Sequence, residues 1–192
     1  MLLLTESDRL LLDHMRSGDG EAFERLFLRY YPPVFRVLYN LVGKRESAED
    51  LAQETFLELY RHTPYLGEEP GATILSWLCR VALNRGYNTL RGEQRERQRL
   101  ERMAERPNMV DPEAELLRSE EHAEVHGTLA RLPERQIRIL SLRYAGLSYS
   151  EIARALDIAP GSVGTLLARA ERAFAAVYNR LESLDTAERT DL

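Results

Sequence analysis

Residues 76–91, SWLCRVALNRGYNTLR, hold the side chains of this chain that are best suited to bind another molecule. They lie in a stretch, residues 70–92, that contains no Asp or Glu, although the whole chain has a net charge of −5. On a helix of about 100° per residue, rings, amides and arginines share an arc of roughly 100°. The members of this face are Trp77, Arg80, Asn84, Tyr87, Asn88 and Arg91. Cations that follow phosphates and rings that stack on bases suit single-stranded nucleic acid, so we expect a strand-binding helix.

The opposite arc of the same helix is apolar and is expected to face a core. Its members are Leu75, Leu78, Cys79, Ala82, Leu83, Gly86 and Leu90. Trp77 borders this arc, and a lone Trp is more often a packing anchor than a base-stacking ring. Arg85 lies off the strand-binding face, where it would reach at most a phosphate. Arg80, Asn84 and Arg91 therefore carry the prediction.

A second candidate surface lies upstream, in AEDLAQETFLELYR, residues 48–61. Asp50, Gln53, Glu54 and Leu57 are spaced to share one side of a helix. A polar, partly acidic side suits docking on a basic protein surface, and the alternative is a solvated face. Ser47, three residues before Asp50, is expected to start this helix.

The segment GLSYSEIARALDIAPGSVGTLLARAERAF, residues 146–174, predicts two helices joined by a tight turn. Ser148 and Glu151 form a capping box for the first helix, and Pro160 suits the first position of the second. Residues 157–159 supply the turn. Such a helix-turn-helix presents its second helix to a DNA major groove, although an ordinary helical hairpin in a core remains an alternative.

Apolar spacing of three and four residues recurs along the chain and no strand-like alternation survives, so the expected fold class is all-α. The pair Pro32–Pro33 marks a kink or a helix start, and the Gly- and Pro-rich segment 63–73 predicts a loop. Residues 93–106 alternate charges without an apolar stripe, which leaves a helix extension or a disordered tether open. Residues 107–112 are expected to be a hinge, with Asp111 and Pro112 starting the next helix.

We therefore expect two small helical domains, the second containing the helix-turn-helix, joined by a charged linker. The expected divisions are residues 1–92, 93–112, 113–180 and a polar, mobile tail over 181–192. No apolar run approaches the ~18 residues of a membrane span, and MLLLT is too short for a signal segment, so a cytoplasmic protein is expected. The single cysteine, Cys79, excludes an internal disulfide and is expected in the core.

Three motifs in order carry a family resemblance. Residues 129–174 resemble region 4 of bacterial sigma-70-family factors, and residues 48–61 resemble their region 2.2. Residues 76–91 resemble regions 2.3 and 2.4 of the extracytoplasmic-function (ECF) group, whose pattern is roughly W-L-x-x-[IV]-A-x-N-x-x-x-D-x-x-R. The matching residues are Trp77, Leu78, Val81, Ala82, Asn84 and Arg91, while Asn88 replaces the usual Asp. The resemblance covers about residues 9–91 and 115–178.

The resemblance implies a sigma factor that binds core RNA polymerase and promoter DNA. It assigns Asp50, Gln53 and Glu54 to the clamp coiled coil of the polymerase β′ subunit, with the β flap as a further contact. It assigns the face of residues 76–91 to the minus-10 element as that element melts. The residues it places at the minus-35 element are Arg143, Ser148, Tyr149, Ser162, Thr165, Arg169 and Arg172.

The helix-turn-helix departs from the family pattern at Gly164 and Leu166, where basic residues are frequent. Gly164 has no side chain to bond a base, so readout falls on Thr165, Arg169 and Arg172, and a weak minus-35 preference is expected. The acidic balance limits phosphate contacts, so the free chain is expected to bind DNA poorly.

Other classes remain to be separated from this one. His122 and His126 have the spacing of a metal pair, but an exposed helix is the alternative, and neither a metal, a cofactor nor an enzyme activity is expected. The main rivals are a helix-turn-helix regulator with a sensing or dimerisation domain, and a helical adaptor that binds only protein. An anti-sigma protein is an open further partner.

Overall fold

The computed structural model describes residues 6–103 and 120–190, and in these ranges it contains helices and no strand. The all-α prediction is confirmed. The helices are α1 (Glu6–Arg16), α2 (Gly20–Val42), α3 (Arg45–Arg61), α4 (Ile74–Met103), α5 (Glu120–Leu129), α6 (Glu134–Tyr144), α7 (Tyr149–Leu156) and α8 (Pro160–Thr190).

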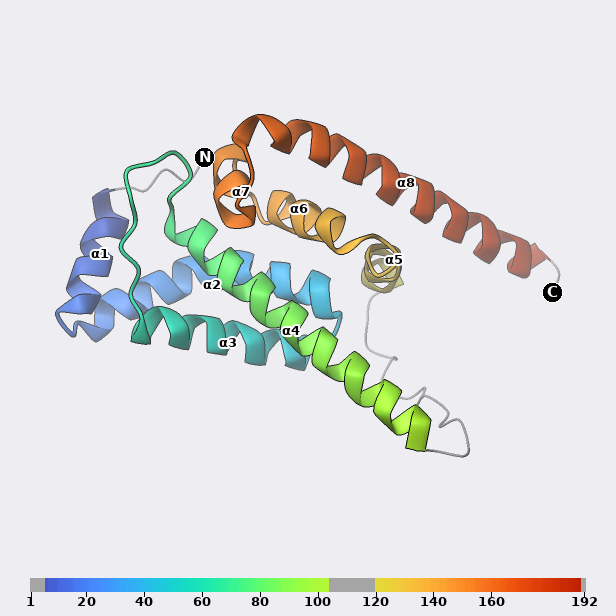
Figure 1. The fold of residues 1–192 in the computed structure, drawn as a ribbon, viewed down its shortest axis with the longest axis horizontal. Helices are drawn as coiled ribbons and strands as arrows, with labels where there is room; N and C mark the ends of the chain where they lie inside the picture. Colours follow the sequence, from blue (N-terminus) through green and yellow to red (C-terminus); the bar gives the residue numbers. More distant parts are fainter. Residues whose placement is uncertain (1–5, 104–119, 191–192) are drawn as a thin grey trace.

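The first domain packs α2, α3 and α4 against one another, with α1 laid across α2 (Figure 1). Leu38, Phe56 and Leu78 are fully buried at the centre of this core. Asp8 is also buried, and it accepts hydrogen bonds from Arg29 and from the Tyr30 hydroxyl, the latter at 2.6 Å. A buried carboxylate needs such partners, so this cluster ties α1 to α2.

The start and end of α2 follow the local sequence. The Asp19 side chain caps its first turn by accepting from the Glu21 amide at 2.9 Å. The helix continues through Pro32 and Pro33, which mark neither a start nor an end. It ends at Gly43, which adopts a left-handed conformation with φ of 68°.

The expected start of α3 at Ser47 is wrong. The helix begins at Arg45, and its N-cap is Lys44, which makes no side-chain capping bond. Only Gly43 and Lys44 separate the end of α2 from α3, so the left-handed turn sets where helical geometry resumes. Arg45 and Glu49, one turn apart, form an ion pair at 2.8 Å that supports this first turn.

The second domain packs α6 and α7 against the first half of α8. Leu142, Ile152 and Val163 are fully buried between these helices. The predicted capping box of Ser148 and Glu151 is present, and α8 begins at Pro160 as expected. Asp157 takes a left-handed conformation with φ of 55° in the turn, which completes the helix-turn-helix.

Two helices run further than the sequence patterns predict. The charged segment that follows Gly92 is helical through Met103, so the helix-extension alternative holds for that part. The segment expected as a polar tail is helical through Thr190, since residues 181–190 contain neither Gly nor Pro to stop α8. The expected hinge over residues 107–112 lies outside the described residues.

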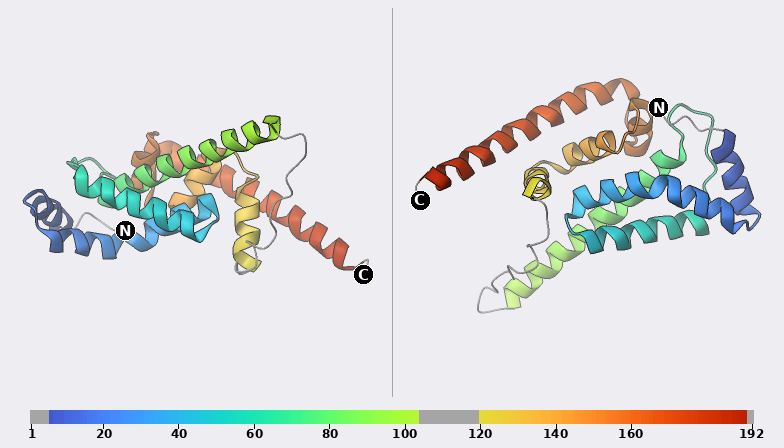
Figure 2. Two further views of the ribbon diagram at one scale, coloured as in Figure 1. Left: turned by 90° about the horizontal axis from the view of Figure 1, so that it is seen from below. Right: turned by 180° about the vertical axis from the view of Figure 1, so that it is seen from behind.

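The two domains are packed on each other. Contacts join α4 to α7 and α2 to both α5 and α6. Figure 1 and the rear view in Figure 2 show α6 and α7 between α8 and the helices of the first domain, with the end of α8 extending beyond them. Among the described helices, none is long and apolar enough to cross a membrane.

Candidate nucleic-acid and polymerase interfaces

The strand-binding face predicted on α4 has the expected apolar back. Five residues of this side each expose 1% or less of their surface: Leu75, Leu78, Cys79, Ala82 and Leu83. Burial in this apolar setting raises the pKa of the Cys79 thiol, which fits its assignment as a core residue. The helical wheel therefore gave the correct inward face of α4.

The polar face of α4 divides into exposed and covered residues. Arg80, Asn84, Asn88 and Arg91 are exposed. Trp77 is half-buried and packs against the core, in line with the packing-anchor alternative. The minus-10 contacts assigned to these residues stay predictions.

The helical wheel placed Tyr87 on the solvent-facing side of α4, but the structure buries it. Only 6% of its surface is exposed, because the N-terminus of α6 lies over it. Its hydroxyl donates to the Glu134 carbonyl at 3.2 Å, and the Arg138 guanidinium lies 4.4 Å from its ring centroid. Burial, followed by the nearby Glu134 carboxylate, raises the pKa of Tyr87.

The neighbours of Tyr87 on α4 are held by the same helix. Arg91 pairs with the Glu134 carboxylate at 2.9 Å. Arg138, which also pairs with Glu134 at 2.7 Å, donates to the Asn84 side-chain oxygen at 3.5 Å. Part of the predicted strand-binding face is thus covered by the second domain.

A second contact between the domains joins two helix starts. Thr73 caps α4 by accepting from the Ser76 amide at 3.1 Å, and its hydroxyl donates to Glu151 Oε1 at 2.8 Å. The other Glu151 oxygen accepts from the Ser148 amide and hydroxyl, at 2.8 and 2.7 Å, in the capping box of α7. Glu151 is only 3% exposed, so both of its oxygens are used within the protein.

The loop before α4 fits closely against α7. Gly71 has φ of 83°, and a Cβ atom there would overlap the Ser150 carbonyl, so glycine is required at this approach. Arg154 of α7 pairs with Glu69 of the same loop. These contacts bring the loop, the start of α4 and the helix-turn-helix together.

The predicted polymerase face on α3 is accessible. Asp50, Gln53 and Glu54 are exposed, and Leu57 retains 47% of its surface. Phe56, on the opposite side of the helix, is buried in the core. The assignment of this face to polymerase stays a prediction.

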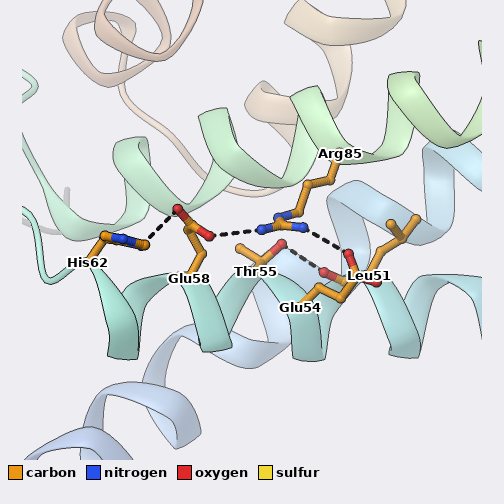
Figure 3. Close-up of polar contacts among 6 residues, drawn as sticks. All are labelled: Leu51, Glu54, Thr55, Glu58, His62 and Arg85. Atoms are coloured by element: carbon orange, nitrogen blue, oxygen red, sulfur yellow. Dashed lines mark hydrogen bonds and ion pairs between the residues drawn. The ribbon is translucent and has the colours of Figure 1, made fainter.

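Sequence reasoning missed a link between α3 and α4. Arg85 donates from Nη1 to Glu54 Oε2 and from Nη2 to Glu58 Oε2, each at 2.9 Å (Figure 3). His62 lies 3.2 Å from the other Glu58 oxygen. The signal available in the sequence was the spacing of Glu54 and Glu58, one helical turn apart, but nothing local pointed Arg85 toward them.

The residues predicted at the minus-35 element lie mostly in the open. Ser162, Thr165, Arg169 and Arg172 are exposed along the first turns of α8. Arg169 also lines an open hollow of about 430 Å³ between α6 and α8. These residues are therefore accessible to a partner.

The remaining minus-35 candidates gather at the start of α7. Arg143 is exposed, with its guanidinium 6.0 Å from the ring centroid of Tyr149, which is 47% exposed. The Ser148 hydroxyl is engaged in the capping box described above.

The metal alternative gains no support. The His126 ring lies so close to Gly43 that a Cβ atom at residue 43 would overlap it, and the side chain of His122 lies outside the described residues. Across the parts of the chain that the structure describes, no group of three or more His, Cys, Asp or Glu side chains is placed to hold a metal ion.

Comparison with known proteins identifies the family. Residues 26–96 match Sigma-70 region 2, and residues 122–174 match Sigma-70, region 4. The RNA polymerase sigma-H factor of Pseudomonas aeruginosa is 32% identical, over 95% of this chain and 98% of that protein. The ECF RNA polymerase sigma-E factor of Haemophilus influenzae is 31% identical, over 93% of this chain and 97% of that protein.

Solved structures show the same fold. CnrH in complex with the cytosolic domain of CnrY aligns with a TM-score of 0.68 at 21% identity, covering 91% of this chain and 99% of that one. RpoE in complex with the anti-sigma factor NepR, from Bartonella quintana, aligns with a TM-score of 0.61 at 21% identity, covering 82% of this chain and 96% of that one.

The chain belongs to the sigma-70 family, in its extracytoplasmic-function group. It is a sigma factor, a non-enzymatic initiation factor that works with RNA polymerase and recognises promoter DNA. The expected class, the expected helix-turn-helix domain and the absence of an enzymatic role are confirmed by this membership.

Proposed function

We propose that α3 is the surface by which this sigma factor binds core polymerase, through the clamp coiled coil of the β′ subunit. Asp50, Gln53 and Glu54 are exposed on one side of the helix, and this polar, acidic side suits a basic partner. The exposed Leu57 beside them supplies an apolar contact. The β flap is the proposed partner of the second domain.

The exposed part of α4 is proposed to bind the minus-10 element as a single strand. Arg80 and Arg91 offer cations to the backbone, Asn84 and Asn88 offer amides to bases, and Tyr87 offers a ring once it is uncovered. No carboxylate lies between residues 70 and 92 to repel a phosphate. Trp77 is proposed to hold the helix on its core more than to stack on a base.

The helix-turn-helix is proposed to bind the minus-35 element weakly. Thr165, Arg169 and Arg172 are its base-reading candidates, with Ser162 and the start of α7 on phosphates. The two modules gain affinity by being joined on one polymerase, because the second binding event occurs at a high effective concentration. This tethering offsets the small electrostatic contribution of an acidic chain.

We infer further that the packed arrangement of the two domains is a closed one. The minus-10 and minus-35 elements are named for positions about 25 base pairs apart, which is about 85 Å of duplex at roughly 3.4 Å per base pair. The starts of α4 and α7 are joined by a 2.8 Å hydrogen bond. A straight duplex could not reach both surfaces so placed, so the domains must separate when promoter and polymerase bind.

Domain limits, location and control complete the proposal. The divisions at residues 1–92, 93–112, 113–180 and 181–192 are retained, with residues 93–103 as a helical part of the linker. The working compartment is the cytoplasm, where RNA polymerase acts. An anti-sigma protein is proposed as a partner because RpoE, which shares the fold, was solved with one.

The observation that carries the proposal is that exposed residues of α3 and α4 form two chemically different faces on one helical domain. The test is co-purification with core polymerase, followed by run-off transcription from a cognate promoter. We expect the chain to confer specific initiation on the core enzyme. Retention on polymerase without initiation would identify an adaptor, and duplex binding without initiation would identify a regulator.

A further inference from the structure

Among the residues drawn in Figure 3, only Arg85 links α4, the proposed strand-binding helix, to α3, the proposed polymerase-binding helix. Its two terminal nitrogens donate to different carboxylates, Glu54 and Glu58, each at 2.9 Å. Glu54 belongs to the proposed polymerase face, while Glu58 lies one turn further along α3. The contacts of Arg85 therefore act on the polymerase face and not on the strand-binding face.

The exposure of the three side chains shows how the bridge is built. Arg85 is 33% exposed and Glu58 is 32% exposed, whereas Glu54 retains 55% of its surface. Both carboxylates meet the arginine through Oε2, and Glu54 remains the more exposed of the two acidic side chains. The second Glu58 oxygen faces His62 at 3.2 Å. Glu54 is thus held in one orientation without being removed from the surface.

We propose that Arg85 is a positioning residue for core-polymerase binding, which fixes the Glu54 carboxylate, with Glu58 as the second anchor of the bridge. This rests on the proposed function, in which Glu54 contacts polymerase. A planar guanidinium suits the role because its fork addresses two carboxylates at once, which an ammonium group cannot do with the same geometry. The role is indirect, since Arg85 acts through Glu54.

Removal of Arg85 has two opposing effects on polymerase affinity. Removing Arg85 would expose more negative charge, which attracts a basic partner but is worth at most about fivefold in affinity at a solvated surface. It would also free the Glu54 carboxylate, and ordering that long side chain at an interface costs about twofold to tenfold. Glu58, one helical turn away, would repel it from the bridged orientation once the cation is lost. These two terms together are larger than the gain in charge, so we expect weaker binding.

The test measures the affinity of the full chain for core polymerase. We expect Arg85→Ala to weaken binding roughly fivefold to tenfold, mainly through faster dissociation. Arg85→Lys keeps the charge but loses the fork, and we expect it to weaken binding nearly as much. Arg25→Ala, which removes an exposed ion pair with Glu21 on α2, is the matched control and should leave affinity within twofold.

A double-mutant cycle separates positioning from a general effect on folding. In a chain that already carries Glu54→Ala and Glu58→Ala, Arg85→Ala should change affinity by less than about twofold. Thermal unfolding of each variant ensures that affinities are compared on folded protein. An equal loss from Arg85→Ala in both backgrounds, or an Arg85→Lys variant with normal affinity, overturns the proposal.

Two further outcomes distinguish this inference from the function on which it rests. If Glu54→Ala weakens core binding and Arg85→Ala does not, Arg85 has no positioning role while the polymerase face stands. If Glu54→Ala itself leaves affinity unchanged, the proposed face on α3 fails and the role of Arg85 fails with it. Normal core affinity of Arg85→Ala combined with reduced promoter melting would place Arg85 on DNA instead.

Discussion

The two surfaces proposed to meet DNA differ in what covers them. On α4, Tyr87 is almost fully buried by the second domain, and Arg91 is paired with Glu134 of α6. On α8, Thr165 and Arg169 are exposed, and this helix packs mainly against α5, α6 and α7 of its own domain. One surface is thus partly occupied within the chain, while the other is open.

The difference also extends to composition. The α4 face presents two arginines and two exposed amides, whereas residues 160–168 at the start of α8 carry no charged side chain. The surface richer in cationic and amide side chains is the one that the second domain partly covers, and the poorer surface is the more accessible one. We expect this arrangement to limit DNA binding by the free chain and to make affinity depend on separation of the domains and on polymerase.

The largest effect is expected from Arg80→Ala on α4. Arg80 is exposed and lies within the proposed strand-binding arc, so its loss removes a backbone contact on melted DNA. We expect run-off transcription to fall about tenfold while core-polymerase affinity is unchanged. Arg25→Ala serves as the control, and a normal transcript yield from Arg80→Ala would show that the α4 face is not the strand-binding surface.

A smaller effect, about fivefold, is expected from breaking the bond between the domains with Thr73→Val. The change leaves a buried Glu151 oxygen without its donor, which costs about 1–3 kcal/mol in the closed arrangement. A larger open fraction raises the apparent affinity of the free chain for single-stranded minus-10 DNA, as measured by fluorescence anisotropy.

Thr73→Ser is the matched variant for that measurement, since it keeps both the hydroxyl donor and the cap of α4. It should bind the oligonucleotide as the unaltered chain does. Equal affinities for Thr73→Val and Thr73→Ser would mean that this contact does not limit DNA binding by the α4 face. Coverage by the second domain would then not explain a difference in DNA affinity between the two surfaces.

The open surface can be strengthened with Gly164→Lys. A Cβ atom there meets only the Tyr149 ring, at an ordinary 3.6 Å, so the backbone position tolerates a side chain. Glycine inside a helix costs about 0.5–1 kcal/mol, so the variant should melt about 2 °C higher. We expect roughly threefold more transcription from a promoter with a minus-35 element and no gain without one. A gain on both promoters would indicate that the added lysine attracts DNA without reading its sequence.

The smallest change is expected from Arg169→Ala. This arginine is exposed on α8 and borders the hollow beside α6, so its removal costs one DNA contact and no core packing. We expect about a twofold loss of minus-35-dependent transcription, in line with a weak readout. Unchanged output would remove Arg169 from the base-reading set. A loss as large as that of Arg80→Ala would show that the α8 surface contributes as much to transcription as the α4 surface.

Much of the local structure follows from short-range pattern. The inward residues of α4, the capping box of Ser148 and Glu151, and the end of α2 at Gly43 all depend on neighbours within a few positions. The start of α3 was misjudged because the turn at Gly43 decided it and not the side chain of Ser47.

The candidate site was less predictable because its partners are distant in the chain. A helical wheel says which residues share a face but not what lies over that face. Tyr87 is covered by Glu134 and Arg138, which are about 50 residues away. Arg85 likewise meets Glu54 and Glu58 through the packing of α4 on α3. Such contacts depend on tertiary packing, which periodicity does not encode.

The burial of Cys79 has a practical consequence for measuring the distance between the domains. It is the only cysteine in the chain, it is fully enclosed on the inward side of α4, and burial raises the pKa of its thiol. The reactive thiolate is therefore scarce, and a dye would have to enter a packed core to reach it. Two cysteines introduced at exposed positions, one in each domain, could be labelled in the otherwise native chain to report the interdomain distance during initiation.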